Sequence, residues 1–230
     1  MDYSVPALDK ALDILELLAR RAGGLSQAAI SAEVGRTVSQ LFRVLQTLEV
    51  RGYLVRDPGS GLYTLSMAMF ELAHRHDPVR GLVAAAIGPM RALAESVRQS
   101  CNLGMPDAGR ILIVAQVESP AAFGFRVRVG AEFPLESTAT GAVLAAFADG
   151  AGASDSRYSE IRSRGFERRS DNLQPGITDI VFPIFGVGEA AIAALTVPYV
   201  ATSFSGSAAE VVEREARAAA SAISGALGHH

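Results

Sequence analysis

The sequence contains little cysteine and no long apolar run, and these two shortages exclude disulfide-rich secreted domains and membrane-spanning proteins. Its one cysteine, Cys101, leaves no disulfide to form within the chain and fits the reducing cytoplasm. The charged start of the chain has no signal-peptide pattern. We therefore expect a cytoplasmic protein without a membrane partner.

Neither sign of charge dominates the chain, whose formal net charge is −3. With 49% hydrophobic and 20% charged residues over 230 positions, the composition is that of a folded protein long enough for two domains. The basic residues are unevenly placed, because the stretch 36–56 contains four arginines and one glutamate, a local charge of +3. Such a basic segment in a weakly acidic chain favours a localised contact with nucleic acid.

The residues from Ser26 to Leu65 have the order of a winged helix-turn-helix. Ser26 can cap a short helix, Gly35 makes a turn, and a second helix is predicted over 37–51. Alternating residues over 53–56 and 62–65 then predict a hairpin. This arrangement places the second helix in the major groove of DNA.

The candidate DNA contacts are the polar residues expected on the outer side of this helix and on the wing. They are Arg36, Thr37, Ser39, Gln40, Arg43, Arg56, Ser60 and Thr64. Glutamine can pair with adenine through two hydrogen bonds, and arginine can do the same with guanine. Arg36 precedes the helix start, where backbone N–H groups also favour phosphate.

The rest of the chain mixes helices and strands, which predicts an α+β fold. We expect a DNA-binding domain over 1–66, a linker helix over 67–77 and a second domain over 78–230. Further helices are predicted at 7–21, 79–98, 138–147, 158–164 and 207–227. Strands are predicted at 101–106, 111–117, 123–129, 166–172, 178–185 and 190–200.

The chain offers no pattern that predicts an enzyme, a cofactor or a metal site. Its four histidines are His74, His76, His229 and His230, and none lies near Cys101 or a Gly-x-Ser-x-Gly turn. Phosphate-binding glycine motifs are also missing. Asp179 stands out because it lies in an apolar strand, where a carboxylate needs a partner or a ligand; a turn residue at the strand entrance is the alternative.

Several long segments resemble the IclR family of bacterial transcription regulators. They are VPALDKALDILELL, LSQAAISAEVG, SQLFRVLQTLEVRGYL and RDPGSGLYTL, followed by VESP, RVGAEFPLESTATGAVLAAF, GITDIVFPIF and AALTV. The resemblance implies a cytoplasmic repressor or activator that dimerises through its N-terminal domain and often forms tetramers. It also implies a GAF-like α/β C-terminal domain that binds small organic acids or aromatic catabolites.

Carried over by motif, the resemblance implies an effector site lined by Ala122, Phe125, Phe133, Ala139, Thr140, Ile177, Asp179 and Thr196. The chain departs from the family at Glu136 and Ala142, where His and Lys are frequent, and at Asp179, where Cys is common. Pro198 replaces Ser or Gly, and Thr37-Val38 replaces Pro-Lys. Asp179 would repel a carboxylate but would accept a hydrogen bond from a hydroxyl, an amine or a phenol.

The sequence as a whole predicts a ligand-responsive regulator. Its expected partners are double-stranded operator DNA, a small effector and further copies of itself in a homodimer or homotetramer. One alternative is a small-molecule sensor or enzyme-like domain whose winged helix binds protein. Another is a constitutive DNA-binding protein whose C-terminal domain only oligomerises. Salt dependence separates DNA from a protein partner, because phosphate contacts release counterions.

Overall fold

The computed structural model describes residues 5–74, 77–148, 158–171, 174–201 and 207–229. The chain divides into two compact units, Met1–Asp77 and Pro78–His230. The predicted linker positions 75 and 76, and the histidines at 76 and 230, lie outside the described residues. Among the described residues, no helix has the length and apolarity that crossing a bilayer requires.

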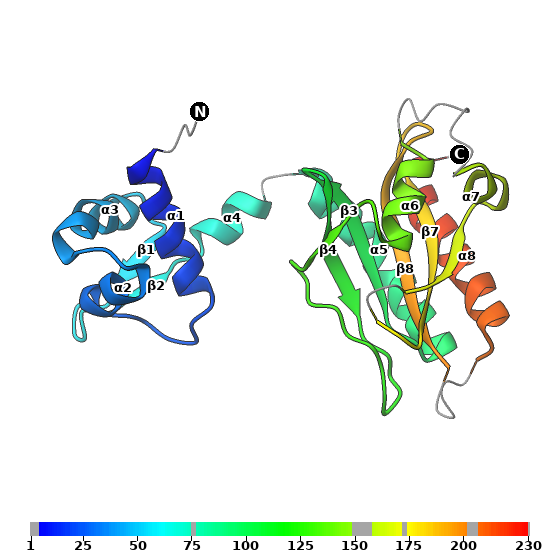
Figure 1. Ribbon diagram of the computed structural model, residues 1–230, viewed down its shortest axis with the longest axis horizontal. Helices are drawn as coiled ribbons and strands as arrows, with labels where there is room; N and C mark the ends of the chain where they lie inside the picture. Colours follow the sequence, from blue (N-terminus) through cyan, green and yellow to red (C-terminus); the bar gives the residue numbers. More distant parts are fainter. Residues whose placement is uncertain (1–4, 75–76, 149–157, 172–173, 202–206, 230) are drawn as a thin grey trace. The chain divides into compact units, whose positions relative to one another are not determined.

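The N-terminal unit is a winged helix-turn-helix, as the sequence predicts (Figure 1). Its elements are α1 (Pro6–Ala19), α2 (Gln27–Val34), α3 (Val38–Val50), β1 (Leu54–Arg56), β2 (Tyr63–Leu65) and α4 (Ala68–His74). The hydroxyl of Ser26 caps α2 by accepting from the Ala29 N–H at 3.2 Å. Gly35 ends α2 in the left-handed region at φ 69°, a conformation that glycine adopts without strain.

The core of this unit comes from the apolar sides of the first three helices and the hairpin. Ile14 and Leu18 of α1 pack with Ile30 of α2 and with Leu41 and Leu45 of α3, and all five are buried. Because these residues recur at helical spacing, each helix has one side in the core and the opposite side in solvent. The core therefore fixes which side of α3 faces solvent.

The C-terminal unit is built on one antiparallel sheet in the order β5-β4-β3-β8-β7-β6. The strands are β3 (Cys101–Asp107), β4 (Arg110–Val117), β5 (Glu132–Pro134), β6 (Glu167–Ser170), β7 (Ile177–Phe185) and β8 (Ala191–Val200). The helices are α5 (Asp77–Val97), α6 (Ala139–Ala146), α7 (Ser159–Arg164) and α8 (Ala209–Ala226). This mixed α+β architecture agrees with the predicted fold class.

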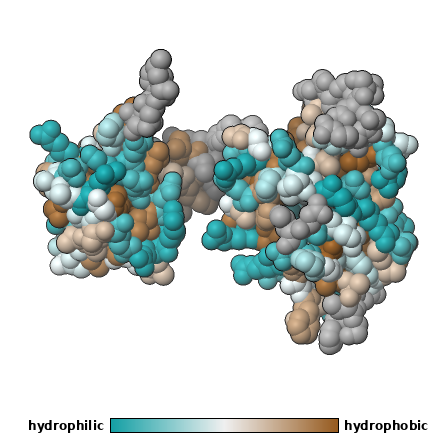
Figure 2. Space-filling model, viewed as in Figure 1, coloured by the Kyte–Doolittle hydropathy of each residue, from teal (hydrophilic) through white to brown (hydrophobic). Residues whose placement is uncertain are grey.

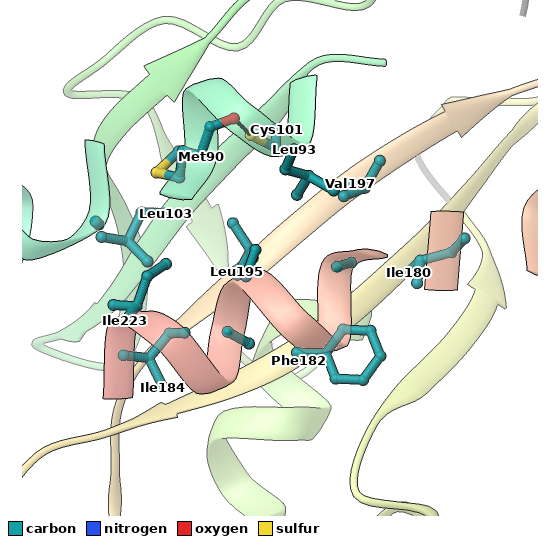
Figure 3. Packing of buried hydrophobic residues seen from close by; sticks show 14 of the residues in the cluster. Met90, Leu93, Cys101, Leu103, Ile180, Phe182, Ile184, Leu195, Val197 and Ile223 are labelled. Carbon is teal, nitrogen blue, oxygen red and sulfur yellow. Dashed lines mark hydrogen bonds between the residues drawn. The ribbon is translucent and has the colours of Figure 1, made fainter. Parts of the chain in front are cut away.

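Both faces of the sheet are covered, which produces two apolar cores in this unit. On one face, α5 and α8 pack against side chains such as Leu103, Phe182 and Leu195 (Figure 3). On the other face, α6, α7 and the loop after β4 pack against Ile111 and Val181. The candidate ligand cavity lies on this second, α6 face.

Cys101 belongs to the first core and is inert. Its side chain is fully buried, and its thiol donates to the Met90 carbonyl at 3.5 Å (Figure 3). Burial raises the pKa of the Cys101 thiol to about 12, so the reactive thiolate is disfavoured. The sequence-based assignment of this residue to the start of a buried strand is confirmed.

The strand predicted over 123–129 is wrong, because these residues form part of a loop that runs from 118 to 131. The sheet resumes only at β5, and the Ile113 backbone bonds instead to Gly130 and Ala131. The alternation of Phe125, Arg126 and Val127 resembles a half-buried strand. In the structure it reflects a loop whose apolar residues cover the sheet, while its arginines are exposed at the edge of the ligand cavity.

Candidate DNA-binding surface and ligand cavity

The start of α3 is fixed by a capping box. The Thr37 hydroxyl accepts from the Gln40 N–H at 3.4 Å, and the Gln40 side-chain oxygen accepts from the Thr37 N–H at 3.1 Å. The Ser39 hydroxyl lies 3.2 Å from that of Thr37. A two-pronged contact of Gln40 with adenine would therefore require the box to open, whereas the Gln40 amide nitrogen remains available to donate.

The outer side of α3 presents Ser39, Arg43 and Gln46 to solvent. No hydrogen bond or ion pair engages the Arg43 guanidinium among the residues that the structure describes. Phe42 is also 54% exposed, and it was not among the predicted contacts because those were all polar side chains. An exposed phenyl ring on a recognition helix suits the methyl group of thymine.

Two side-chain hydrogen bonds help to hold the turn between α2 and α3. The Ser31 hydroxyl donates to the Arg36 carbonyl, and the Gln27 amide donates to the Val38 carbonyl at 3.3 Å. The Arg36 side chain stays exposed next to the start of α3. The turn therefore positions a cation beside backbone N–H groups, the combination that favours phosphate.

The wing is stiffened by its own polar contacts. Asp57 accepts from both the N–H and the hydroxyl of Ser60, each at 2.6 Å, and these bonds lower the pKa of the Asp57 carboxyl. The Arg56 guanidinium lies 5.5 Å from the centre of the Tyr63 ring. Of the three wing candidates, Ser60 is engaged within the wing, Arg56 is placed over a ring, and Thr64 is exposed.

The second candidate site is a cavity of about 260 Å³ on the α6 face of the sheet. Five of the eight predicted effector residues line it: Phe125, Phe133, Thr140, Asp179 and Thr196. Ala139 is buried at the start of α6, Ile177 lines a neighbouring cavity, and Ala122 lines neither. The structure thus brings together most of the set.

The floor of this cavity carries buried polar side chains. Thr140 of α6 and Thr196 of β8 share a hydrogen bond of 2.9 Å between their hydroxyl oxygens. Asn102, opposite Thr196 on β3, is only 4% exposed. No described residue makes a hydrogen bond to the side chain of Asn102 or of Asp179. Buried polar groups without partners favour a bound molecule that supplies them.

Asp179 is the chemically distinctive group of the cavity. Burial raises the pKa of its carboxyl to about 6; the nearby Asp171 adds to this increase and Arg169 opposes it. Near neutral pH both protonation states are accessible, so the carboxyl can accept from a hydroxyl and, once protonated, can donate.

The start of α6 borders the cavity. The Thr138 hydroxyl donates to the Pro134 carbonyl at 3.0 Å and accepts from the Gly141 N–H at 3.1 Å. The N–H groups of Ala139 and Thr140 bond to no described acceptor. Helix starts of this kind favour negative or electron-rich ligand atoms.

The cavity lining also includes residues that were not predicted from the sequence, namely Asn102, Arg126, Arg128, Asp171, Gln174 and Pro198. Asn102 could have been found as a polar residue within an apolar strand, the signal that identified Asp179. Arg126 lies 2.9 Å from Glu118 in an exposed ion pair. Neither Arg126 nor Arg128 was predicted as a cavity residue, because the alternating apolar and polar residues over 123–129 predicted a strand.

These observations define the class of protein as a regulator. One unit has an accessible recognition helix, and the other has a cavity lined by buried polar side chains. Models of a single family match both units, the IclR helix-turn-helix domain over residues 7–58 and the bacterial transcriptional regulator IclR C-terminal domain over residues 78–158. Together they span more than half of the chain.

Individual relatives match between 64% and 99% of the chain. The chain is 26% identical to the transcriptional regulator KdgR of Escherichia coli over 99% of this chain and 94% of that protein. It is 31% identical to the glycerol operon regulatory protein of Streptomyces griseus over 64% and 58% of the two chains. An IclR homologue from Microbacterium hydrocarbonoxydans, solved with 4-hydroxybenzoate, has the same fold, with a TM-score of 0.75, 21% identity and coverage of 96% and 98%.

The chain belongs to the IclR family of bacterial transcription regulators. It combines a DNA-binding helix-turn-helix domain with a C-terminal effector-binding domain, and its relatives are regulators, not enzymes.

Proposed function

We propose that the chain binds a palindromic operator as a homodimer and that a small hydroxylated organic or aromatic acid in the α6-face cavity changes its affinity for DNA. The observation that carries the proposal is the unengaged Arg43 on the outer side of a winged-helix recognition helix. We assign DNA binding to residues 1–66, linkage to 67–77, and effector binding and further oligomerisation, up to a tetramer, to 78–230.

The recognition helix supports specific binding because its free side chains complement one another. Arg43 can read guanine, Gln46 can read adenine, and Phe42 can contact a thymine methyl group. Arg36 and Arg56 supply charge at the two flanks, where phosphate contacts fix the register.

Exposed apolar residues support dimerisation through the N-terminal unit. Leu8 and Leu12 of α1 and Val5, which precedes the helix, are between 48% and 57% exposed. Helix α4 adds Met69, Phe70 and Leu72. Figure 2 shows apolar side chains at the surface of this unit. A patch of this kind on a folded unit marks an interface, and two-fold symmetry matches a palindromic operator.

The cavity supports a ligand with a hydrogen-donating end. Asp179 and Asn102 offer acceptors at the buried end, while Phe125 and Phe133 offer flat apolar walls. The 4-hydroxybenzoate in the Microbacterium homologue has this combination of ring, hydroxyl and acid. Such an effector shifts operator affinity only by binding two arrangements of the protein unequally, by about 1–3 kcal/mol.

The test begins with selection of a duplex from a random pool by the purified full-length chain, followed by fluorescence anisotropy at two salt concentrations. We expect tight binding that weakens with salt, because arginine–phosphate contacts release counterions. Arg43→Ala should weaken binding by about 1–3 kcal/mol and relax specificity. Arg110→Ala, which removes an equal charge from an exposed pair with Glu132 in the other unit, is the matched control.

Failure to select any sequence above random DNA would contradict operator binding. The effector arm adds 4-hydroxybenzoate to the selected complex. Asp179→Ala should alter that dose response and leave DNA affinity in the absence of ligand unchanged. An identical dose response for the variant would place Asp179 outside the effector site.

A further inference from the structure

A second cavity, of about 400 Å³, adjoins the first on the same face of the sheet. Phe125 and Gln174 line both cavities and so form the boundary between them. The second cavity also includes Arg98, Gln99 and Ile177 in its lining. Two cavities with common walls can hold one longer molecule.

The strand register shows how the two cavities are arranged. Asp179 pairs with Pro198, and both line the first cavity; Ile177 pairs with Val200, and both line the second. Residues two apart on a strand face the same side and are separated by about 7 Å. The cavities are therefore consecutive along β7 and β8, with the second toward the beginning of β7.

Among the described residues that line the second cavity, Arg98 is the only charged one. It follows the end of α5 and adopts φ 55°, in the left-handed region where glycine is the usual residue. Its N–H donates to the Ala94 carbonyl at 2.9 Å, and its carbonyl accepts from the Ser119 hydroxyl at 2.7 Å. The backbone is therefore held in a conformation that is unfavourable for arginine.

Contacts with the described residues give the side chain of Arg98 no structural role that would explain this strain. It is exposed, and no described residue forms a hydrogen bond or ion pair with its guanidinium. The neighbouring Gln99 differs, because its buried amide bonds to both the N–H and the carbonyl of Val200 at 3.3 Å. Strained residues with accessible side chains are concentrated at binding sites.

We propose that the two cavities form one elongated site in which Arg98 binds the carboxylate of a hydroxyaryl alkanoic acid. The hydroxyl end lies at Asp179 and Asn102, the ring lies beside Phe125, and the acid lies in the second cavity. The acid is assigned to the second cavity because the described lining there holds Arg98 and no carboxylate. The first cavity is lined by Asp171 and Asp179 as well as by Arg128 and by Arg126, which pairs with Glu118. This inference rests on the proposed effector function and specifies its ligand class.

The test uses calorimetric titration of the full-length chain with 3-(4-hydroxyphenyl)propanoate and with its neutral amide, which has the same length. We expect the wild-type chain to prefer the acid about tenfold, since a charge-assisted hydrogen bond distinguishes the two. Arg98→Gly should abolish that preference and raise the thermal midpoint, because glycine relieves the backbone strain. Arg98→Lys should keep part of the preference.

The glycine variant cannot fail merely by unfolding, which makes its negative result informative. If Arg98→Gly gains stability and still prefers the acid, or if the wild-type chain shows no preference, the role of Arg98 is overturned. Thr140→Val tests the first cavity separately. If Thr140→Val weakens binding of the amide, the first cavity remains the effector site even when the wild-type chain shows no preference for the acid.

Discussion

At the scale of the residue, Asp179 links ligand chemistry to stability. Its pKa is about 6 in the folded chain against an ordinary value of 3.8, so folding favours its protonated form. Below pH 3.8 both the folded and the unfolded state hold the proton, and the carboxyl imposes no penalty. The penalty grows as the pH rises to 6 and is constant above, on the order of 2–3 kcal/mol.

Asp179→Asn should therefore stabilise the ligand-free protein at pH 7.5, by roughly 1–3 kcal/mol in urea unfolding, because the amide never carries the buried charge. The gain should shrink steadily between pH 6 and pH 4. The nearby charged groups, Asp171 and Arg169, remain in both proteins, so the difference between the two profiles isolates residue 179.

Asp107→Asn, which neutralises an exposed carboxylate at the end of β3, is the control and should show no such profile. A stability difference between wild type and Asp179→Asn that stays constant from pH 4 to pH 8 would contradict the assigned shift.

Sequence alone identified Asp179 because a carboxylate within an apolar strand requires an explanation. Asn102 carries the same signal and was overlooked, and because β3 is covered on both sides the sequence does not show which face it joins. Arg98, by contrast, could not be found from the sequence. Nothing in its neighbours along the chain specifies that its φ is positive, since that depends on bonds to Ser119, 21 positions away.

At the scale of the element, the position of α6 depends on the absence of a side chain at Gly141. A Cβ placed there would lie 1.7 Å from the Leu135 carbonyl oxygen, which is backbone and cannot move aside easily. The loop before α6 therefore crosses the helix at this glycine and brings Thr138 and Thr140 to the cavity.

Gly141→Ala should destabilise the protein by about 3 kcal/mol, because helix and loop must separate. The same change should weaken effector binding, since Thr140 moves with the helix. Gly88→Ala, in α5 where a Cβ meets nothing within 4 Å, should instead stabilise by up to about 1 kcal/mol through helix propensity. Urea unfolding of both variants checks the contrast, and equal effects would contradict the assigned crossing.

The elements that sequence predicted well are those whose patterns are local. The caps at Ser26 and Gly35 and the periodicity of α3 each require only a few neighbouring residues. The loop that was mistaken for a strand shows the limit. Whether Phe125 and Val127 form a strand or a loop that covers the sheet depends on backbone partners from elsewhere in the chain. Here those partners lie on β4 around Ile113.

At the scale of the whole molecule, the proposed homodimer requires a contact surface on the N-terminal unit. This unit has a complete core and still exposes an apolar stripe on α1, which supports α1 as that surface. The stripe is separate from the side of α1 that carries Ile14 and Leu18. Interface and fold can therefore be tested independently.

Leu12→Glu should lower the assembled mass in sedimentation velocity and weaken binding to a palindromic duplex by about 100-fold. The two N-terminal units would then bind their half-sites independently, without the raised effective concentration that a dimer provides. The domain should stay folded, because Leu12 is 48% exposed and lies outside the core. Val187→Glu places the same charge at a residue that is 91% exposed between β7 and β8, and should change neither quantity. If Leu12→Glu keeps both its mass and its affinity for the palindrome, α1 is not the dimer interface, and the apolar residues of α4 become the surface to test.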